Sequence, residues 1–147
     1  MSTRDHDAVP RAIEALPSGS YVMTSAYEGE RAGVLVSWVT RVADEPALVC
    51  VAVRKGHAIE PLIRDSRAFA LCRVDAEDKL VRRTFSDTRP PDERGDLFDS
   101  IAVRTLATGA PVLSRSTLAL DCEVVRHFDL EADHELYVGQ VVGALAP

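Results

Sequence analysis

The sequence lacks the features that mark membrane-spanning, exported and nucleic-acid-binding chains. No apolar run approaches the ~20 residues that a membrane helix needs. The start, MSTRDHDAVPRAIEAL, carries acidic residues and has no apolar core, unlike a secretory signal peptide. Lysine occurs only at positions 55 and 79, the net charge is -6, and no basic block is interleaved with aromatics. These absences predict a cytoplasmic protein that binds neither membrane nor nucleic acid.

Cysteine is also sparse. Cys50, Cys72 and Cys122 stand singly in apolar surroundings, with no C-x-x-C pair, and their number is odd. A disulfide framework or a cysteine zinc site needs closely spaced or even-numbered cysteines. We therefore expect three small, reduced core side chains.

What is present suits one globular domain. The 147 residues are 46% hydrophobic and 27% charged, and a chain of this length can bury a core without metal or disulfide support. No internal repeat or low-complexity tract divides it. We expect a single domain over residues 1–147, with a disordered tail at 1–9.

The first half reads mainly as strands. A Pro at a plausible first helical position predicts a short helix over 10–16. Residues rich in β-branched and aromatic types on either side of a turn-like EGER predict a hairpin of 20–27 and 32–42. The continuous apolar run 47–53 predicts a strand covered on both faces.

The second half mixes helices and strands. Helical spacing predicts a helix over 56–66, with Pro61 in its first turn. The remaining expectations are a strand at 68–74, a helix at 76–85, a polar loop at 86–96, an irregular stretch at 97–116, and two strands within 118–146 joined by a turn at 131–135. Short strands with few helices favour a mainly β fold, an antiparallel barrel with peripheral helices.

Arg54, Lys55, Gly56 and His57 stand where a strand gives way to a helix. A helix start offers unpaired backbone N–H groups and the positive end of the helix dipole. Basic side chains and a glycine at that position favour a phosphate cradle. A solvated turn with incidental charges fits these residues equally well.

Ser37, Trp38, Val39 and Thr40 place two hydroxyls beside a large aromatic ring. Such a stretch can hold a flat heteroaromatic ligand, because hydroxyls bind the ring edge while apolar groups cover its face. The alternative is a strand whose Trp38 belongs to the core.

Asp133, His134 and Glu135 form a titratable cluster directly before an apolar strand. The cluster is a candidate for a functional site, and the alternative is a surface turn that merely collects polar residues. A metal site made by these three is disfavoured, because consecutive strand residues point to opposite faces. We expect no metal site, and we expect His6 and His127 to be structural or solvated.

Taken together, the ordered pattern of residues from about Gly19 to Gly143 resembles the flavin reductase-like, FMN-binding split-barrel family. It is most similar to the reductase modules of some flavodiiron proteins and to the reductase components of two-component monooxygenases. The residues that carry the resemblance are Gly33, Ser37, Pro46, Leu48, Lys55, Phe69, Gly109-x-Pro111-x-Leu113, Cys122, Asp133-His134 and Gly139-x-Val141.

The resemblance implies a homodimeric, six-stranded antiparallel Greek-key split barrel that binds FMN, or FAD, near the subunit interface. It implies that the strand around residues 37–40 contacts the isoalloxazine ring. It also implies that Lys55, His57 and Ala58, at the entrance of the helix, hold the phosphate and ribityl chain. Arg41 would stabilise the anionic reduced flavin if it points inward. The implied cofactor-binding residues are Val36, Ser37, Trp38, Val39, Thr40, Arg41, Arg54, Lys55, Gly56, His57 and Ala58.

The implied activity is that of an NAD(P)H:flavin oxidoreductase. A hydride would pass from nicotinamide C4 to flavin N5, and the reduced flavin would supply a monooxygenase or another acceptor. His134 would position the nicotinamide, with Asp133 fixing its tautomer. The alternatives are an FMN-binding electron carrier or redox sensor without NAD(P)H turnover, and a barrel that binds haem or a deazaflavin instead.

Overall fold

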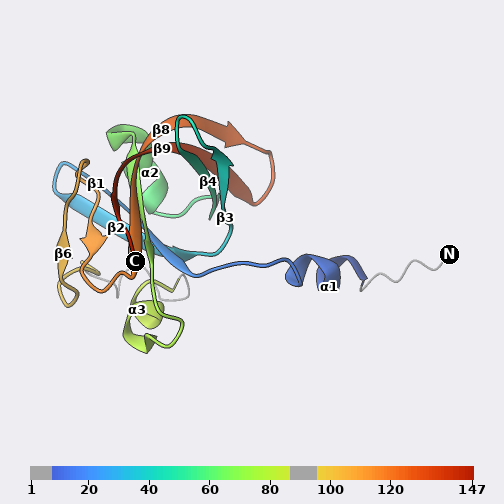
Figure 1. Cartoon of the computed structure of the whole chain (residues 1–147), viewed down its shortest axis with the longest axis horizontal. Helices are drawn as coiled ribbons and strands as arrows, with labels where there is room; N and C mark the ends of the chain where they lie inside the picture. Colours follow the sequence, from blue (N-terminus) through green and yellow to red (C-terminus); the bar gives the residue numbers. More distant parts are fainter. Residues whose placement is uncertain (1–7, 87–95) are drawn as a thin grey trace.

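A curled antiparallel sheet forms the body of the protein (Figure 1). The computed structural model describes residues 8–86 and 96–147. Its helices and strands are α1 (Ala8–Glu14), β1 (Tyr21–Tyr27), β2 (Glu30–Val36), β3 (Val39–Ala43), β4 (Leu48–Arg54), α2 (Ile59–Ser66), β5 (Ala68–Arg73), α3 (Lys79–Thr84), β6 (Val103–Arg104), β7 (Val112–Leu113), β8 (Leu118–Asp129) and β9 (His134–Leu145).

The connection between β2 and β3 forces the sheet to curl. The seven strands run in the order β2-β1-β5-β8-β9-β4-β3, so β2 and β3 lie at opposite ends. In a flat sheet with strands ~4.8 Å apart, those ends would be about 29 Å from each other. Only Ser37 and Trp38 join them, and such a link spans about 10 Å. The sheet must therefore close on itself as a barrel.

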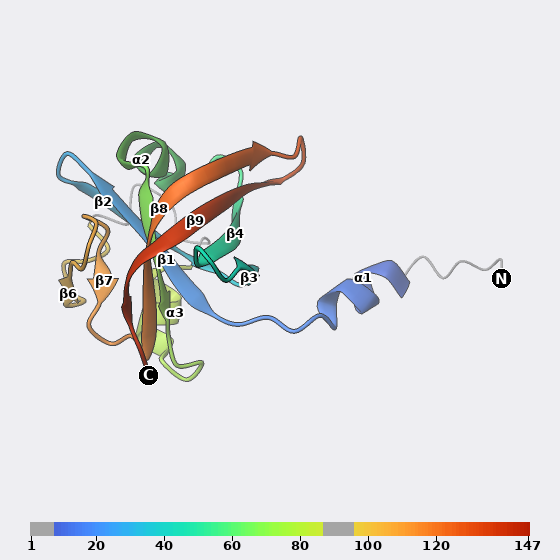
Figure 2. The ribbon, with the colours of Figure 1, turned by 45° about the horizontal axis from the view of Figure 1, so that its top comes forward.

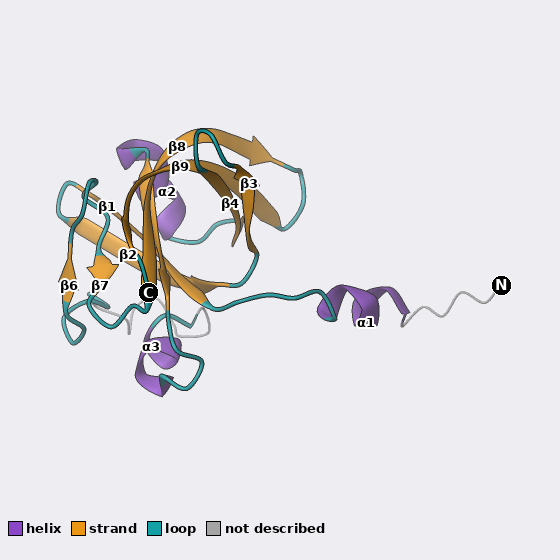
Figure 3. Cartoon of the chain, viewed as in Figure 1, coloured by secondary structure: helices purple, strands orange, loops and turns teal. Residues whose placement is uncertain are grey.

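The predicted number of six strands is wrong, because the main sheet has seven. The single strand expected over 32–42 breaks at Ser37 and Trp38 into β2, which pairs with β1, and β3, which pairs with β4. The β8–β9 hairpin lies between the consecutive strands β4 and β5. The expected mainly β, antiparallel architecture with peripheral helices is confirmed (Figure 3).

The helices follow the sequence pattern with shifted ends. Pro61 lies in the first turn of α2, where its missing N–H is harmless. In α3, the Asp78 side chain caps the helix by accepting the backbone N–H of Val81. The first helix already includes Ala8 and Val9. The rest of the expected tail, 1–7, and most of the expected loop, 87–95, lie outside the described residues.

Helix α1 stands away from the barrel on an extended segment, and no residue in it is buried (Figure 2). Its apolar side chains Val9 and Ile13 are 69% and 57% exposed. Over residues 8–86 and 96–147, no helix is long and apolar enough to cross a membrane.

Two cores share the central strands. Along β1 and β5, Met23 and Leu71 point into the barrel, while Val22 and Cys72 join a second cluster on the other side. Burial on both faces explains why β5 reads as a continuous apolar run. Cys72 and Cys122 are buried and free, as expected, and burial raises the pKa of Cys122 to about 12.

Strand β4 departs from the expectation of burial on both faces. Val49, Val51 and Val53 are buried in the barrel, but Cys50 and Ala52, on the other face of β4, are only half-buried. The run is apolar on both faces because its second face forms the floor of a pocket rather than a core.

Close packing inside the barrel explains one glycine of the family pattern. A Cβ atom on Gly139 would lie 2.6 Å from Phe69 Cζ and 2.7 Å from Cys122 Cβ. Phe69 and Cys122 belong to the same sequence pattern, so three of its members are one packing contact between β5, β8 and β9.

We expect Gly139→Ala to lower the free energy of unfolding by about 1–3 kcal/mol, because the added methyl overpacks the barrel. Urea unfolding measures the change. Gly109→Ala is the matched control, since nothing lies within 4 Å of its Cβ position, and we expect it to stay within about 0.5 kcal/mol of the parent. Equal stabilities for the two variants would contradict this packing account.

Candidate functional site

The outer face of β4 and β9 carries the candidate site. These strands are antiparallel neighbours, and Arg54 pairs with His134 while Ala52 pairs with Leu136. Paired residues present their side chains on the same face. The predicted basic residue and the predicted histidine, 80 positions apart in sequence, are thus brought together by the register of one strand pair.

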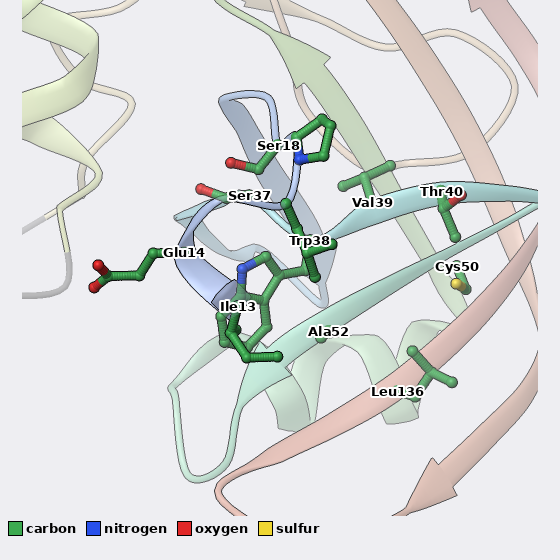
Figure 4. A pocket seen from close by; sticks show the side chains of 12 residues that line it. Ile13, Glu14, Ser18, Ser37, Trp38, Val39, Thr40, Cys50, Ala52 and Leu136 are labelled. Carbon is green, nitrogen blue, oxygen red and sulfur yellow. The ribbon is translucent and has the colours of Figure 1, made fainter. Parts of the chain in front are cut away.

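A cavity of about 630 Å³ lies over this face (Figure 4). Its floor is small and apolar, formed by Cys50, Ala52 and Leu136, and Thr40 stands opposite Cys50 on β3. The end of α1 and the residues that follow it, within 13–18, contribute one wall. The cavity is wide, open and mainly apolar, as a planar aromatic ligand requires.

A second cavity, of about 260 Å³, lies beside the first and has a different character. It is lined by Arg54, His57 and His134, together with Val36 and other residues of β2. The two cavities share Ser37, Trp38 and Ala52. An apolar space and a basic space therefore adjoin along one wall.

Trp38 is the shared wall. Its side chain is 57% exposed, so the alternative that it belongs to the core is wrong. Its backbone C=O accepts the N–H of Ala52 at 3.1 Å, which fixes the segment against β4. The Trp38 and His134 rings contact each other, with centroids 4.5 Å apart and planes tilted by 42°.

The His134 ring is hydrogen-bonded to the side chain of its neighbour Asp133. The distance from His134 Nδ1 to Asp133 Oδ1 is 3.0 Å, and this hydrogen bond lowers the pKa of Asp133. An ionised carboxylate accepts only, so the proton of a neutral imidazole lies on Nδ1 and Nε2 becomes an acceptor. This is the geometry expected for Asp133 setting the tautomer.

At the start of α2, side chains rather than backbone N–H groups are available to bind a ligand. The Ile59 N–H donates to His57 Nδ1 at 3.0 Å, so a neutral His57 carries its proton on Nε2 and can donate from there. The Gly56 N–H donates to Glu60 Oε2 at 2.8 Å, and its φ of +89° explains the glycine. Two of the backbone N–H groups that were expected to bind a phosphate therefore already donate to side chains of the protein.

Four of the predicted cofactor-binding residues do not line either cavity. Arg41 points away and forms an ion pair with Asp44 at 2.6 Å. Lys55 pairs with Asp129 at 2.9 Å. The other two are Gly56 and Ala58, which shape the helix entrance.

Sequence reasoning missed the floor and the outer wall. Cys50, Ala52 and Leu136 read as ordinary strand residues, and their small size was the only signal in the sequence. Ile13 and Leu16 are exposed apolar residues of the N-terminal segment that line the larger cavity or its rim. Their contribution depends on where the chain folds, which spacing does not reveal.

His127 was expected to be structural or solvated, and the structure gives it structural partners. Its Nε2 forms a short hydrogen bond with Glu135, and its ring stacks on that of Tyr137 at a centroid distance of 4.3 Å. Tyr137 in turn donates to Glu60 at 2.9 Å. These side chains lie on the opposite face of β9 from His134, as alternation requires.

A curled antiparallel barrel with an open aromatic-walled cavity and an adjoining basic corner defines a class of small ligand-binding barrels. The chain belongs to the flavin reductase-like family: residues 13–147 match the domain described as "Flavin reductase like domain". This confirms the resemblance seen in the sequence pattern.

Two relatives illustrate the family. The chain is 28% identical over 142 residues to diflavin flavoprotein A 1 of Synechocystis sp., covering 96% of this chain and 24% of that protein. It is 29% identical over 128 residues to the FMN reductase (NADH) RutF of Bradyrhizobium diazoefficiens, covering 84% of this chain and 69% of that protein. The chain thus spans about a quarter of the diflavin flavoprotein.

Solved structures show the same fold. The NADH:FAD oxidoreductase SgcE6 of Streptomyces globisporus C-1027 superposes with a TM-score of 0.83 at 25% identity, covering 100% of this chain and 86% of that one. A further structure of SgcE6, in complex with NAD and FAD fragments, superposes at 0.82 with 24% identity, covering 97% of this chain and 83% of that one.

Proposed function

We propose that this chain is an NADH-dependent flavin reductase. The observation that carries the proposal is the apolar cavity walled by Trp38, which adjoins a basic corner formed by Arg54, His57 and His134. The names of relatives as an FMN reductase (NADH) and an NADH:FAD oxidoreductase support both the flavin and the choice of NADH.

The residues present fit FMN. Val39, Cys50, Ala52 and Leu136 supply apolar surface for a planar ring system, and the Thr40 side chain supplies a hydroxyl at its edge. In the smaller cavity, Arg54 offers a bidentate cation, which suits a phosphate.

His57 and Ser37 complete the basic corner. With Nδ1 occupied by the Ile59 N–H, a neutral His57 can donate from Nε2 toward an anionic group. Ser37 is exposed between the two cavities, where its hydroxyl can reach a ligand that crosses from one to the other. We infer that FMN lies across Trp38, with its ring in the larger cavity and its phosphate in the smaller one.

Bound flavin would supply the hydride-accepting chemistry, which the protein itself cannot provide. The role of the chain is to orient the two ring systems. His134 Nε2, an acceptor in the neutral tautomer, can bind an amide N–H of a nicotinamide. Trp38 beside it limits where a second ring can stack.

We further propose that the protein acts as a homodimer and passes reduced flavin to an oxygenase or other acceptor. The exposed apolar side chains of the N-terminal segment, of the link between β2 and β3, and of β3 support the dimer, because a second copy would cover them. Those side chains are Val9, Ile13, Leu16, Trp38 and Val42.

We expect Arg54→Ala to weaken FMN binding about tenfold, as for loss of one charge-assisted hydrogen bond worth ~1.5 kcal/mol. Quenching of FMN fluorescence during titration measures the affinity. Arg41→Ala is the matched control. Arg41 lies on β3 directly after the cavity residue Thr40, but it lines neither cavity. Equal losses in both variants would contradict the placement of the phosphate.

We expect His134→Ala to lower kcat/KM for NADH about tenfold while changing FMN affinity less than threefold, because the imidazole orients the nicotinamide rather than the flavin. Steady-state oxidation of NADH with FMN present measures the first quantity. Asp133→Asn should move kcat/KM in the same direction. Full NADH turnover in His134→Ala would remove this role from the histidine.

A further inference from the structure

A second polar cluster lies inside the barrel wall, on the other side of β9 from His134. Glu60 of α2, His127 of β8 and Glu135 of β9 each place one potential ligand atom within 4.8 Å of the others. Glu60 and Glu135 are only 3% and 8% exposed, whereas His127 reaches the surface. Three separate elements therefore converge on one point at the edge of the core.

Neighbouring groups hold Glu60 and His127 in place. Glu60 accepts the Tyr137 O–H at 2.9 Å and the Gly56 N–H at 2.8 Å, one on each carboxylate oxygen. The His127 ring lies flat on Tyr137, with only 3° between the ring planes. Each oxygen of Glu60 keeps a free lone pair for another partner.

The charges in the cluster are unbalanced. Two largely buried carboxylates face one imidazole, and His127 Nε2 is hydrogen-bonded to one of them, Glu135. Lys55 is bound to Asp129 at 2.9 Å, and Arg64 and Arg67 line a neighbouring cavity together with His127 and Tyr137. An ion among these three ligand atoms would take the place of the proton in the hydrogen bond between His127 and Glu135 and contact both carboxylates.

We propose that Glu60, His127 and Glu135 bind a divalent transition-metal ion, with zinc as the type. One imidazole nitrogen and two carboxylate oxygens are ligands that zinc accepts, and three protein ligands leave a fourth position for water. A cavity of about 300 Å³, lined by His127 and Tyr137, gives that position access to solvent. The hydrogen bonds to Glu60 would act as the outer shell that orients a ligand.

This site is distinct from the proposed flavin cavity, although β9 serves both. His134 and Glu135 are consecutive, so they face opposite sides of the strand. The Gly56 N–H, which binds Glu60, lies at the helix entrance beside His57. An ion on Glu60 would thus sit behind the basic corner without entering it, and its role would be to stabilise this end of the barrel.

Titration of the full chain with ZnCl2 by isothermal calorimetry tests the proposal. We expect one equivalent to bind, and affinity to fall at least tenfold in Glu135→Gln and in His127→Gln. Cys50→Ser and His134→Gln are matched controls that remove another candidate ligand each, and both should still bind one equivalent. No saturable binding by the parent, or unchanged binding in Glu135→Gln and His127→Gln, would overturn the site.

Zinc-edge X-ray absorption on the parent protein with one equivalent of zinc does not depend on whether a variant folds. We expect a first shell of nitrogen and oxygen atoms only, at about 2.0–2.1 Å and with a histidine contribution. Sulfur at about 2.3 Å would assign the ion to a cysteine instead and contradict the proposal. A shell of oxygen alone would contradict it as well.

Discussion

Closure of the barrel through Ser37 and Trp38 is the constraint on which the site depends. Two residues join the opposite ends of a seven-stranded sheet, and both are exposed. Trp38 consequently stands on the outside, bonded to Ala52 through its backbone, and becomes the wall between the two cavities. A side chain that would be core in a regular strand is available to a ligand because the sheet closes there.

Strand β9 links the site to the core. Its alternate residues face the cavities on one side, beginning with His134 and Leu136, and the barrel interior on the other, beginning with Glu135 and Tyr137. One strand therefore presents the His134 imidazole outward and the polar cluster of Glu135 inward, without any turn between them. Gly139 further along the same strand permits the close packing that fixes its position, so a disturbance of the core would also displace the face of the site.

The sequence predicted what depends on local pattern and left out what depends on closure. Strand and helix positions such as β5 and α2 follow from their apolar spacing, and the ordered motif residues were sufficient for the family. The break at Ser37 and Trp38 was missed, because the flanking run is β-favourable throughout and only the topology interrupts it. Arg41 was placed in the site for the same reason, since the face on which a strand residue lies depends on its register. The partners of His127 lie in other elements and leave no mark on its neighbours in sequence.

The most direct test of the central claim is anaerobic mixing of the FMN-loaded protein with NADH, followed at the flavin absorption band near 450 nm. The account predicts that the flavin binds to the parent protein and bleaches on addition of NADH much faster than free FMN does at the same concentrations. A flavin that binds but stays oxidised would contradict the reductase and favour an electron carrier or redox sensor. Failure to bind FMN at all would contradict the placement of a flavin in the cavity beside Trp38.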